Sequence, residues 1–413
     1  MEFVSETIIA RRLESLAGAQ PRVAVSGNFA TPHELLRVLG TTLERCRLFV
    51  LNPQAGWPVR EGLVTETPFV GPGVRDDPTM DYLPMRLSLV PRLFALNRPP
   101  DAVLIQTSAP KGGKVSLGIE VNIMPAAIEE VRRRGGFVIA QVNPQMPYTR
   151  GDGELSLDMI DLAIEVDQAL PGPSTRETDD VALQIGANVA TLARDGSTLQ
   201  MGIGALPDAA LSHMHGLRDL GIWSEMISDG VLELERLGAL DRSRPVISTF
   251  LFGSAELYQW AHDNPRLVMR RTETVNDPAR IAEHPLMLAI NTAIQIDLYA
   301  QANASYVRGR IYSGYGGQPD FVGGALHSAQ GQSVLALHSW HDKTATTSVL
   351  PLLEVPATSF QHSVVVTENG IAPLFGRSQH AQARLLIEHV AHPKARDALT
   401  EAAKELGLWR EQQ

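Results

Sequence analysis

Continuous apolar runs of strand length, separated by helix-length segments, are the feature of this sequence that most constrains its fold. Residues 102–106 and 136–142 are two such runs, and residues 122–134 between them are predicted to form a helix. A strand that is covered on both faces has an apolar run that does not alternate with polar residues. Strands that alternate with helices predict a mostly parallel sheet in a doubly wound α/β fold.

The same alternation occurs on both sides of a polar segment with two prolines at residues 170–176. A chain of 413 residues is too long for one simple core. We therefore expect two doubly wound open-sheet α/β domains, at residues 1–175 and 176–413. Strands are predicted at residues 22–27, 48–51, 102–106, 136–142, 197–201, 245–251, 332–337 and 363–367. Helices are predicted at residues 6–16, 122–134, 180–193, 207–215, 381–389 and 393–406. A further helix is predicted to begin with Thr31 as its N-cap and Pro32 as its first residue.

Charge and cysteine content exclude several classes of protein. The formal net charge of −10 argues against DNA or RNA as the main partner, because phosphate binding needs a clustered basic surface. No run of 18 apolar residues is present, so no membrane span is expected, and residues 1–6 do not resemble a signal peptide. Cys46 is the only cysteine, which excludes an internal disulfide and favours a cytoplasmic location.

The sequence lacks the motifs that are typical of two other enzyme classes, zinc enzymes and serine hydrolases. Two pairs of histidines fit no known zinc pattern, so no metal is expected; they are His213 with His215 and His338 with His341. No Gly-x-Ser-x-Gly string is present, which disfavours a serine hydrolase of the α/β type.

A glycine-containing turn at residues 202–207, Gly-Ile-Gly-Ala-Leu-Pro, is the first candidate site. It is expected to join a strand to a helix. Glycines there let backbone amides approach a ligand oxygen, and a helix start adds partial positive charge. The turn therefore has the chemistry to hold a phosphate or an oxyanion. It lacks the third glycine of a dinucleotide fingerprint, and a plain strand-to-helix turn remains the alternative.

Glu225 and the segment at residues 310–321 are the other two candidates. Glu225 follows a short apolar segment, and a carboxylate at the end of a parallel strand lies where open α/β sheets bind ligands. Such a group can attack an activated acyl carbon, although a solvated or helix-capping acid is the alternative. Residues 310–321 contain three glycines in four positions, beside aromatic side chains that favour burial over a flexible surface turn.

These motifs, in this order, resemble the acetyl-CoA hydrolase/transferase family of class I CoA-transferases. That family includes 4-hydroxybutyrate and succinyl-CoA:acetate CoA-transferases. The similarity covers nearly the whole chain. The matching strings are residues 115–118, 139–143 with 146–147, 164–167, 201–207, 224–226 with 228–230, 275–278, 314–321 and 366–370. The resemblance implies the two-domain CoA-transferase fold, with the active site between the domains and the catalytic glutamate in the second.

By this resemblance Glu225 matches the family's catalytic glutamate, which forms an acyl-glutamyl anhydride and then a glutamyl-CoA thioester. Asn276 matches an asparagine near the reacting carboxylates and is a neutral amide donor. The oxyanion stabilisers implied are Gly204, Gly316 and Gly317. The CoA-binding residues implied are Gly202, Ile203, Gly204, Ala205, Leu206 and Gly314. Coenzyme A is then a substrate and not a resident cofactor, the partners are a short acyl-CoA and a small carboxylate, and the assembly is a homodimer or larger.

Three positions qualify the resemblance. Glu368 lies in Thr-Glu-Asn-Gly, which looks like the active-site string of other class I enzymes, but it comes too late after the glycine turn and is interpreted as structural or as a wall of the cleft. Gln295 stands where the family often has glutamate, which leaves the polarity of the cleft and substrate choice open. Residues 338–341 replace small and basic residues, which leaves the affinity for CoA open.

Three other functions remain as alternatives at this point. A thioester hydrolase differs from a transferase only in whether water enters the cleft. A CoA-binding protein without turnover would keep the glycine loops but would not need Glu225. A nicotinamide dehydrogenase would need the third glycine of the dinucleotide fingerprint.

Overall fold

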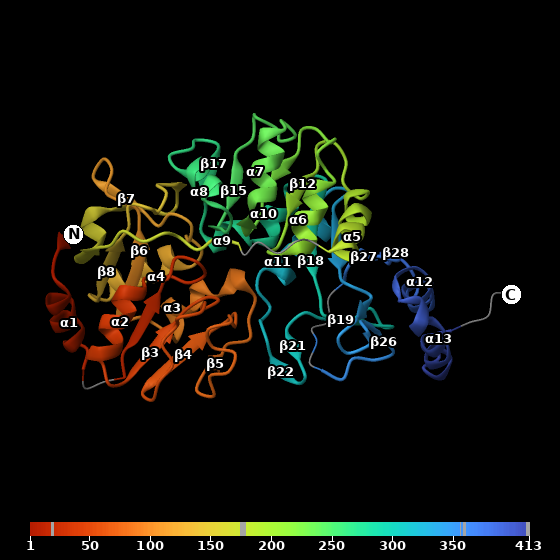
Figure 1. Ribbon diagram of the computed structural model, residues 1–413, viewed down its shortest axis with the longest axis horizontal. Helices are drawn as coiled ribbons and strands as arrows, with labels where there is room; N and C mark the ends of the chain where they lie inside the picture. The colour runs from red at the N-terminus through yellow and green to blue at the C-terminus, as the bar shows by residue number, and fades with distance from the viewer. Residues whose placement is uncertain (18–19, 174–178, 356, 358–360, 410–413) are drawn as a thin grey trace. The chain divides into compact units, whose positions relative to one another are not determined.

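Two compact units make up the chain, and each has a parallel sheet and an apolar core. The computed structural model describes residues 1–413 apart from 18–19, 174–178, 356, 358–360 and 410–413 (Figure 1). The first unit comprises Met1–Pro173, Pro245–Asp277 and Ile311–Gly317. The second comprises Ser174–Arg244, Pro278–Arg310 and Gln318–Gln413.

The predicted boundary between residues 175 and 176 lies close to the point where the chain first enters the second unit. The predicted ranges place Pro245–Asp277 and Ile311–Gly317 in the second domain, whereas these segments belong to the first unit. Residues 174–176 of the predicted linker lie outside the described residues.

An eight-stranded sheet forms the centre of the first unit, and all its neighbouring strands run parallel. Its spatial order is β1 (Glu2–Phe3), β11 (Leu162–Glu165), β8 (Phe137–Val142), β6 (Ala102–Thr107), β2 (Arg22–Val25), β3 (Cys46–Phe49), β4 (Leu63–Thr67) and β5 (Asp81–Tyr82). Every residue of β6 and β8 is buried, which confirms that these continuous apolar runs are central strands. The unit's short strands are β7 (Lys114–Ser116), β9 (Arg150–Gly151), β10 (Glu154–Ser156), β15 (Val246–Ser248), β16 (Phe250–Leu251) and β17 (Leu267–Met269).

The helices of the first unit are α1 (Glu6–Glu14), α2 (His33–Thr42), α3 (Pro91–Leu96), α4 (Met124–Arg133), α8 (Ala255–Ala261) and α9 (Thr272–Val275), with 3-10 turns at Leu87–Leu89 and Leu157–Met159. The predicted N-cap of α2 is wrong. Pro32 is the N-cap, and the Thr31 hydroxyl donates to the carbonyl of Asn28 instead. The side chain of Gln141, on β8, accepts the N–H of Glu34 in the first turn. A contact from a distant strand thus replaces the local cap.

A six-stranded sheet forms the centre of the second unit (Figure 1). Its spatial order is β13 (Gly221–Ile222), β12 (Thr198–Gln200), β18 (Met287–Thr292), β23 (Gln332–Ala336), β27 (Val364–Thr367) and β28 (Gly370–Pro373). The first five strands run parallel, and β28 returns antiparallel to β27. The central strand β18 was not predicted. Short strands of this unit are β14 (Met226–Ile227), β19 (Gln295–Asp297), β20 (Ala302–Asn303), β21 (Tyr306–Val307), β24 (Trp340–His341), β25 (Thr346–Thr347) and β26 (Val349–Leu350), and β22 (Arg310–Ile311) ends where the chain leaves it.

The helices of the second unit are α5 (Asp180–Ala190), α6 (Ala205–Ser212), α7 (Asp229–Arg236), α10 (Pro278–Ala282), α11 (Gln318–His327), α12 (Gln379–Leu385) and α13 (Arg396–Glu405). A π-helical turn, Leu386–Val390, continues α12, and a 3-10 turn, Pro393–Ala395, precedes α13. Helix α6 packs between α5 and α7 (Figure 1). It begins at Ala205, directly after Gly204 and so within the predicted turn at residues 202–207, and not at residue 207 as predicted. The doubly wound α/β class is confirmed for both units.

Candidate active site

The strand order of the second unit produces a topological switch point at β12. The chain passes from β12 to β13 on one side, and the next strand of the sheet, β18, lies on the other side of β12. In open α/β sheets, ligands bind beyond the carboxyl ends of the strands at such a point. A ligand site is therefore expected among the segments that follow β12, β13 and β18.

The glycine turn follows β12 at this switch point. Gly204 is the N-cap of α6 and has φ +122° and ψ −179°, a backbone conformation that is nearly restricted to glycine. A Cβ atom built on Gly202 or Gly204 would meet no atom within 4 Å, so open space surrounds the backbone there. The side chain of Ile203 is itself 43% exposed. The turn therefore presents backbone amides and a helix N-terminus to an open region.

Glu225 follows β13, the neighbour of β12. The parallel register pairs Leu199 with Ile222, and the N–H of Trp223 donates to the carbonyl of Leu199 at 3.1 Å. Continuing this register brings Glu225 beside the start of the glycine turn. Glu225 is half-buried. The structure thus brings Glu225 and residues 202–206 to one edge of one sheet, as expected if they form one site.

Two further contacts hold the segments around Glu225. The ring of Trp223 lies 4.4 Å from the ring of His284, at an interplanar angle of 39°. Burial, and then the nearby charge of Arg244, lower the pKa of His284 below its ordinary value of 6.5, so the imidazole in this tilted ring contact is neutral near pH 7. The hydroxyl of Ser228 donates to the carboxylate of Asp208 at 2.6 Å, which ties the start of α7 to α6.

Sequence reasoning missed one polar pair at the switch point. Gln200 ends β12 and Asn291 lies near the end of β18, and both are buried. The amide of Asn291 donates to the side-chain oxygen of Gln200 at 3.1 Å. A polar residue at the end of a buried strand is the signal that would have identified each of them. Their pairing depends on the position of β18, which the sequence pattern did not reveal.

Glu368, the alternative candidate for the nucleophile, lies after β27 and is held by hydrogen bonds to neighbouring residues. It accepts hydrogen bonds from the backbone N–H of Ser339 at 3.0 Å and from the Ser339 hydroxyl, and the amide of Asn369 lies 3.4 Å from it. Ser339 is fully buried. These contacts support the interpretation of Glu368 as a structural residue.

The two segments that depart from the family pattern also lie in the second unit. Gln295, on β19, accepts a hydrogen bond from the amide of Asn303 at 3.2 Å. In the segment at residues 338–341, His338 lies 3.8 Å from the carboxylate of Asp179, and the ring of Trp340 lies 4.7 Å from the ring of His392 at an interplanar angle of 32°. These contacts are internal to the unit and leave substrate choice and CoA affinity as open predictions.

Asn276 and the second glycine segment belong to the first unit. Asn276 is fully buried directly after α9, and that helix is anchored because Thr272 donates its hydroxyl to the side chain of Asn122 at 2.8 Å. Asn122 in turn donates to the buried carboxylate of Glu120 at 3.0 Å. A polar network therefore fixes the position of Asn276.

Gly314, Gly316 and Gly317 lie in the segment that follows β22. A Cβ atom on Gly314 would come within 2.7 Å of the carbonyl of Pro68, so only glycine allows this close approach. Gly316 has φ +55°, and its carbonyl accepts the N–H of Leu87 at 2.9 Å. The segment is thus packed against the chain beyond β4 and is not a loose surface turn.

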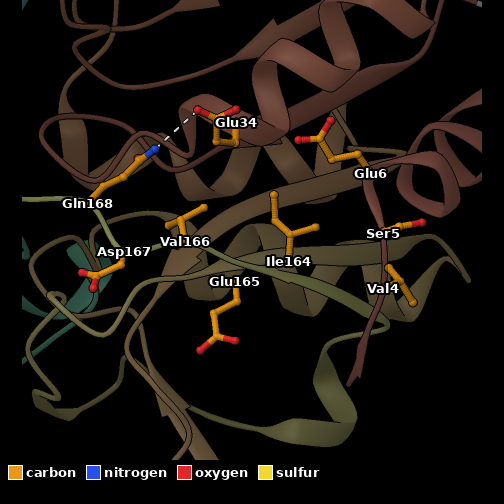
Figure 2. Close-up of a pocket in the computed structure, with 9 residues that line it drawn as sticks. All are labelled: Val4, Ser5, Glu6, Glu34, Ile164, Glu165, Val166, Asp167 and Gln168. Carbon is orange, nitrogen blue, oxygen red and sulfur yellow. Dashed lines mark hydrogen bonds between the residues drawn. The ribbon is translucent and has the colours of Figure 1, made fainter.

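A pocket of about 480 Å³ lies beyond β11 in the first unit (Figure 2). Its carboxylates are those of Glu6, Glu34, Glu165 and Asp167. Gln168 donates to Glu34 at 3.4 Å across the pocket (Figure 2). None of the predicted site residues lines it. A wall of carboxylates disfavours an anionic ligand such as coenzyme A, so this pocket is not the candidate site.

Comparison with known proteins identifies the family. The sequence models of the acetyl-CoA hydrolase/transferase N-terminal and C-terminal domains match residues 67–173 and 253–403. The 4-hydroxybutyrate coenzyme A transferase of Clostridium kluyveri is 38% identical over 80% of this chain and 80% of its own length. The succinyl-CoA:acetate/propanoyl-CoA:succinate CoA transferase of Fasciola hepatica is 36% identical over 92% of this chain and 84% of its own length.

The chain belongs to the acetyl-CoA hydrolase/transferase family. It is an enzyme of the CoA-transferase type. The crystal structure of a 4-hydroxybutyrate CoA-transferase from Porphyromonas gingivalis has a TM-score of 0.81 to this chain, with 27% identity and 98% of each chain covered. The fold is therefore the CoA-transferase fold, and the resemblance seen in the sequence is confirmed.

Within the residues that the structure describes, no three histidine, cysteine, aspartate or glutamate side chains come together as metal ligands. Of the helices in that same part of the chain, none has the length and apolar character needed to cross a bilayer.

Proposed function

We propose that the enzyme transfers CoA between a short acyl-CoA and a small carboxylate, with Glu225 as the nucleophile. The observation that carries the proposal is the position of Glu225 at the carboxyl end of β13, beside the glycine turn at a topological switch point. Glu368, the other carboxylate in a similar string, accepts hydrogen bonds from the N–H and the hydroxyl of Ser339, which supports a structural role for it.

The proposed chemistry needs only carboxylate, anhydride and thioester. A carboxylate oxygen of Glu225 attacks the thioester carbonyl, the C–S bond breaks, and CoA leaves as a thiolate with an acyl-glutamyl anhydride left behind. The thiolate attacks the glutamyl carbonyl, which forms the glutamyl-CoA thioester and releases the acyl group as a carboxylate. A second carboxylate reverses these steps, and Glu225 is regenerated. No net proton is gained or lost, so no general base is required.

Each of these steps passes through an oxyanion, and the proposal assigns donors to it. They are the backbone amides of Gly204, Gly316 and Gly317. One such donor typically contributes about 3 kcal/mol to the transition state. Asn276 supplies a neutral amide donor near the reacting carboxylates. Coenzyme A, a substrate here and not a resident cofactor, is assigned to the residues Gly202, Ile203, Gly204, Ala205, Leu206 and Gly314.

Hydrolysis is the second candidate because the family model covers both hydrolases and transferases. The two differ in whether water or a carboxylate resolves the glutamyl-CoA thioester. Turnover of acyl-CoA measured with and without a set of carboxylate acceptors separates them. A rate that depends on the acceptor supports transfer, and an equal rate without any acceptor supports hydrolysis.

The nucleophile is tested by trapping. The enzyme is incubated with acetyl-CoA, reduced with borohydride, digested and analysed by mass spectrometry. We expect reduction of the side chain at Glu225 and at no other glutamate. Glu368→Gln, as the control variant, should give the same modification at residue 225. An active preparation that is left unmodified at Glu225 would contradict the assignment.

A further inference from the structure

A serine beside Glu225 links the two segments of the proposed site. Ser224 is fully buried. Its hydroxyl donates to the carbonyl of Met201 at 3.1 Å and accepts the N–H of Met201 at 3.2 Å. Met201 directly precedes Gly202, and Ser224 directly precedes Glu225. A single oxygen atom therefore joins the residue before the glycine turn to the residue before the proposed nucleophile.

This link continues the sheet where its backbone ladder has ended. The strands β12 and β13 pair through Thr198 with Gly221 and Leu199 with Ile222, and the last backbone bond is the one from Trp223. Beyond it the Ser224 side chain satisfies both backbone groups of Met201. Met201 is fully buried, so its N–H and C=O have no access to water if that oxygen is removed. The backbone would then have to rotate to find new partners.

The same arrangement occurs at the other end of the sheet. The hydroxyl of Ser363, before β27, donates to the carbonyl of Ser333 at 3.0 Å and accepts the N–H of Ser333 at 2.8 Å. Ser333 lies near the start of β23, and both serines are buried. This second link is at the amino ends of the strands, where it fixes the sheet but adjoins none of the proposed site residues.

We propose that Ser224 is a positioning residue of the reaction, which sets the place of Glu225 relative to the amides of the glycine turn. The inference rests on the proposed function. Attack on a thioester and stabilisation of the oxyanion need both groups in place together, and a misplacement of about 1 Å can lower a rate about a hundredfold. Because Ser224 contacts neither CoA nor the acyl group in this account, its loss affects the chemical step and not the binding of acyl-CoA.

The matched pair Ser224→Ala and Ser363→Ala tests this assignment. Each variant removes two side-chain hydrogen bonds, but the Ser333 carbonyl keeps the backbone N–H of Ser363 at 3.0 Å, so we expect a lower melting temperature in both and the smaller decrease in Ser363→Ala. In single turnover with acetyl-CoA, followed by borohydride trapping, Ser224→Ala should form the glutamyl adduct about a hundredfold more slowly. Its KM for acetyl-CoA should stay within about twofold of wild type, and Ser363→Ala should trap the adduct at the wild-type rate. If Ser224→Ala does not fold, Ser224→Cys keeps the side-chain size with weaker hydrogen bonds and should show the same order of rates.

The outcomes separate the inference from the function on which it rests. A wild-type enzyme that turns over but traps nothing at Glu225 overturns the proposed function. A wild-type adduct at Glu225 that Ser224→Ala forms at the same rate overturns the positioning role alone. Equal slowing by Ser224→Ala and Ser363→Ala also overturns it, because the effect would then come from stability and not from position.

Discussion

The two ends of the six-stranded sheet in the second unit contain similar polar chemistry for different purposes. At the carboxyl ends a serine oxygen links Met201 to the Glu225 turn, and at the amino ends a serine oxygen links Ser333 to the start of β27. At the carboxyl ends the glycine turn next to the link is open and Ile203 is exposed. At the amino ends the link is covered, and the neighbouring His362 is 4% exposed.

This contrast shows that buried polar groups do not by themselves mark a site. Both serines satisfy backbone groups that water does not reach, and either would be costly to remove. The location on the sheet makes the difference, because only the carboxyl ends at the switch point adjoin an open turn with free room around its backbone. We therefore expect substitutions beside the glycine turn to change the rate of the reaction, whatever they do to stability, and substitutions at the amino ends to change stability alone.

The largest expected effect is at the carboxyl ends. Glu225→Gln should lower kcat by at least about a thousandfold, because the amide is not a nucleophile. Its melting temperature should remain close to that of wild type, since the amide has nearly the same shape. Initial rates of acyl-CoA turnover and thermal unfolding check the two parts. A Glu225→Gln enzyme with more than a tenth of the wild-type rate would contradict the role of Glu225 as the nucleophile, and with it the difference between the two ends of the sheet.

At the amino ends we expect a pH effect on stability. Burial lowers the pKa of His362 from 6.5 to about 4. Below pH 6.5 the unfolded chain takes up a proton that the folded chain does not, so this group's stabilisation is present above pH 6.5 and is lost as the pH falls toward 4. The total is about 3 kcal/mol. Urea unfolding between pH 7.5 and 5 should show about 2 kcal/mol of this loss in wild type and not in His362→Gln.

The exposed His215 offers the control for that experiment. His215→Gln should leave the pH dependence of unfolding as it is in wild type. If His362→Gln and wild type lose the same free energy of unfolding on acidification, His362 is not the cause of the loss. The proposed effect of the amino ends on stability would then be contradicted.

Glu368 lies at the carboxyl ends but is expected to affect stability. Glu368→Ala leaves the N–H and the hydroxyl of the buried Ser339 without their acceptor, which should cost about 2 kcal/mol. Chemical denaturation measures this, with the exposed Glu388→Ala as a control that should change stability by less than about 0.5 kcal/mol. Borohydride trapping in Glu368→Ala should still modify Glu225. Loss of the adduct in a folded Glu368→Ala enzyme would show that Glu368 is more than structural.

Much of this arrangement could be predicted from the sequence, because it follows from strand ends. Continuous apolar runs identified β6 and β8, and the rule that ligands bind at the carboxyl ends of parallel strands favoured residues 202–206 and Glu225 together. What pattern could not supply was register. The partners of Ser224 and Gln200 depend on which strand lies beside β12 and at what offset, and no local periodicity records this.

The wrong prediction of the N-cap of α2 has the same origin. Thr31 looked like an N-cap because the local string fits one, but Gln141 from a strand far along the chain takes that role. The passage of Pro245–Asp277 into the first unit has no signal in composition. The roles of Glu225 and Asn276, the cytoplasmic location and the homodimeric or larger assembly remain predictions from the resemblance and the cysteine content.

The smallest expected effect separates the two glycines of the turn. Gly204 has φ +122°, which an alanine adopts only at a cost of about 1 to 3 kcal/mol, whereas the φ of Gly202 is not positive. Neither position has an atom within 4 Å of an added Cβ, so packing does not distinguish them. Gly204→Ala should therefore lower kcat/KM for acyl-CoA about tenfold, and Gly202→Ala should leave it within about twofold. Steady-state kinetics of the two variants measure this. If the two variants lower kcat/KM equally, the ligand requires open space near the backbone and not the special conformation of Gly204. The turn would then act only by letting the ligand approach the backbone closely.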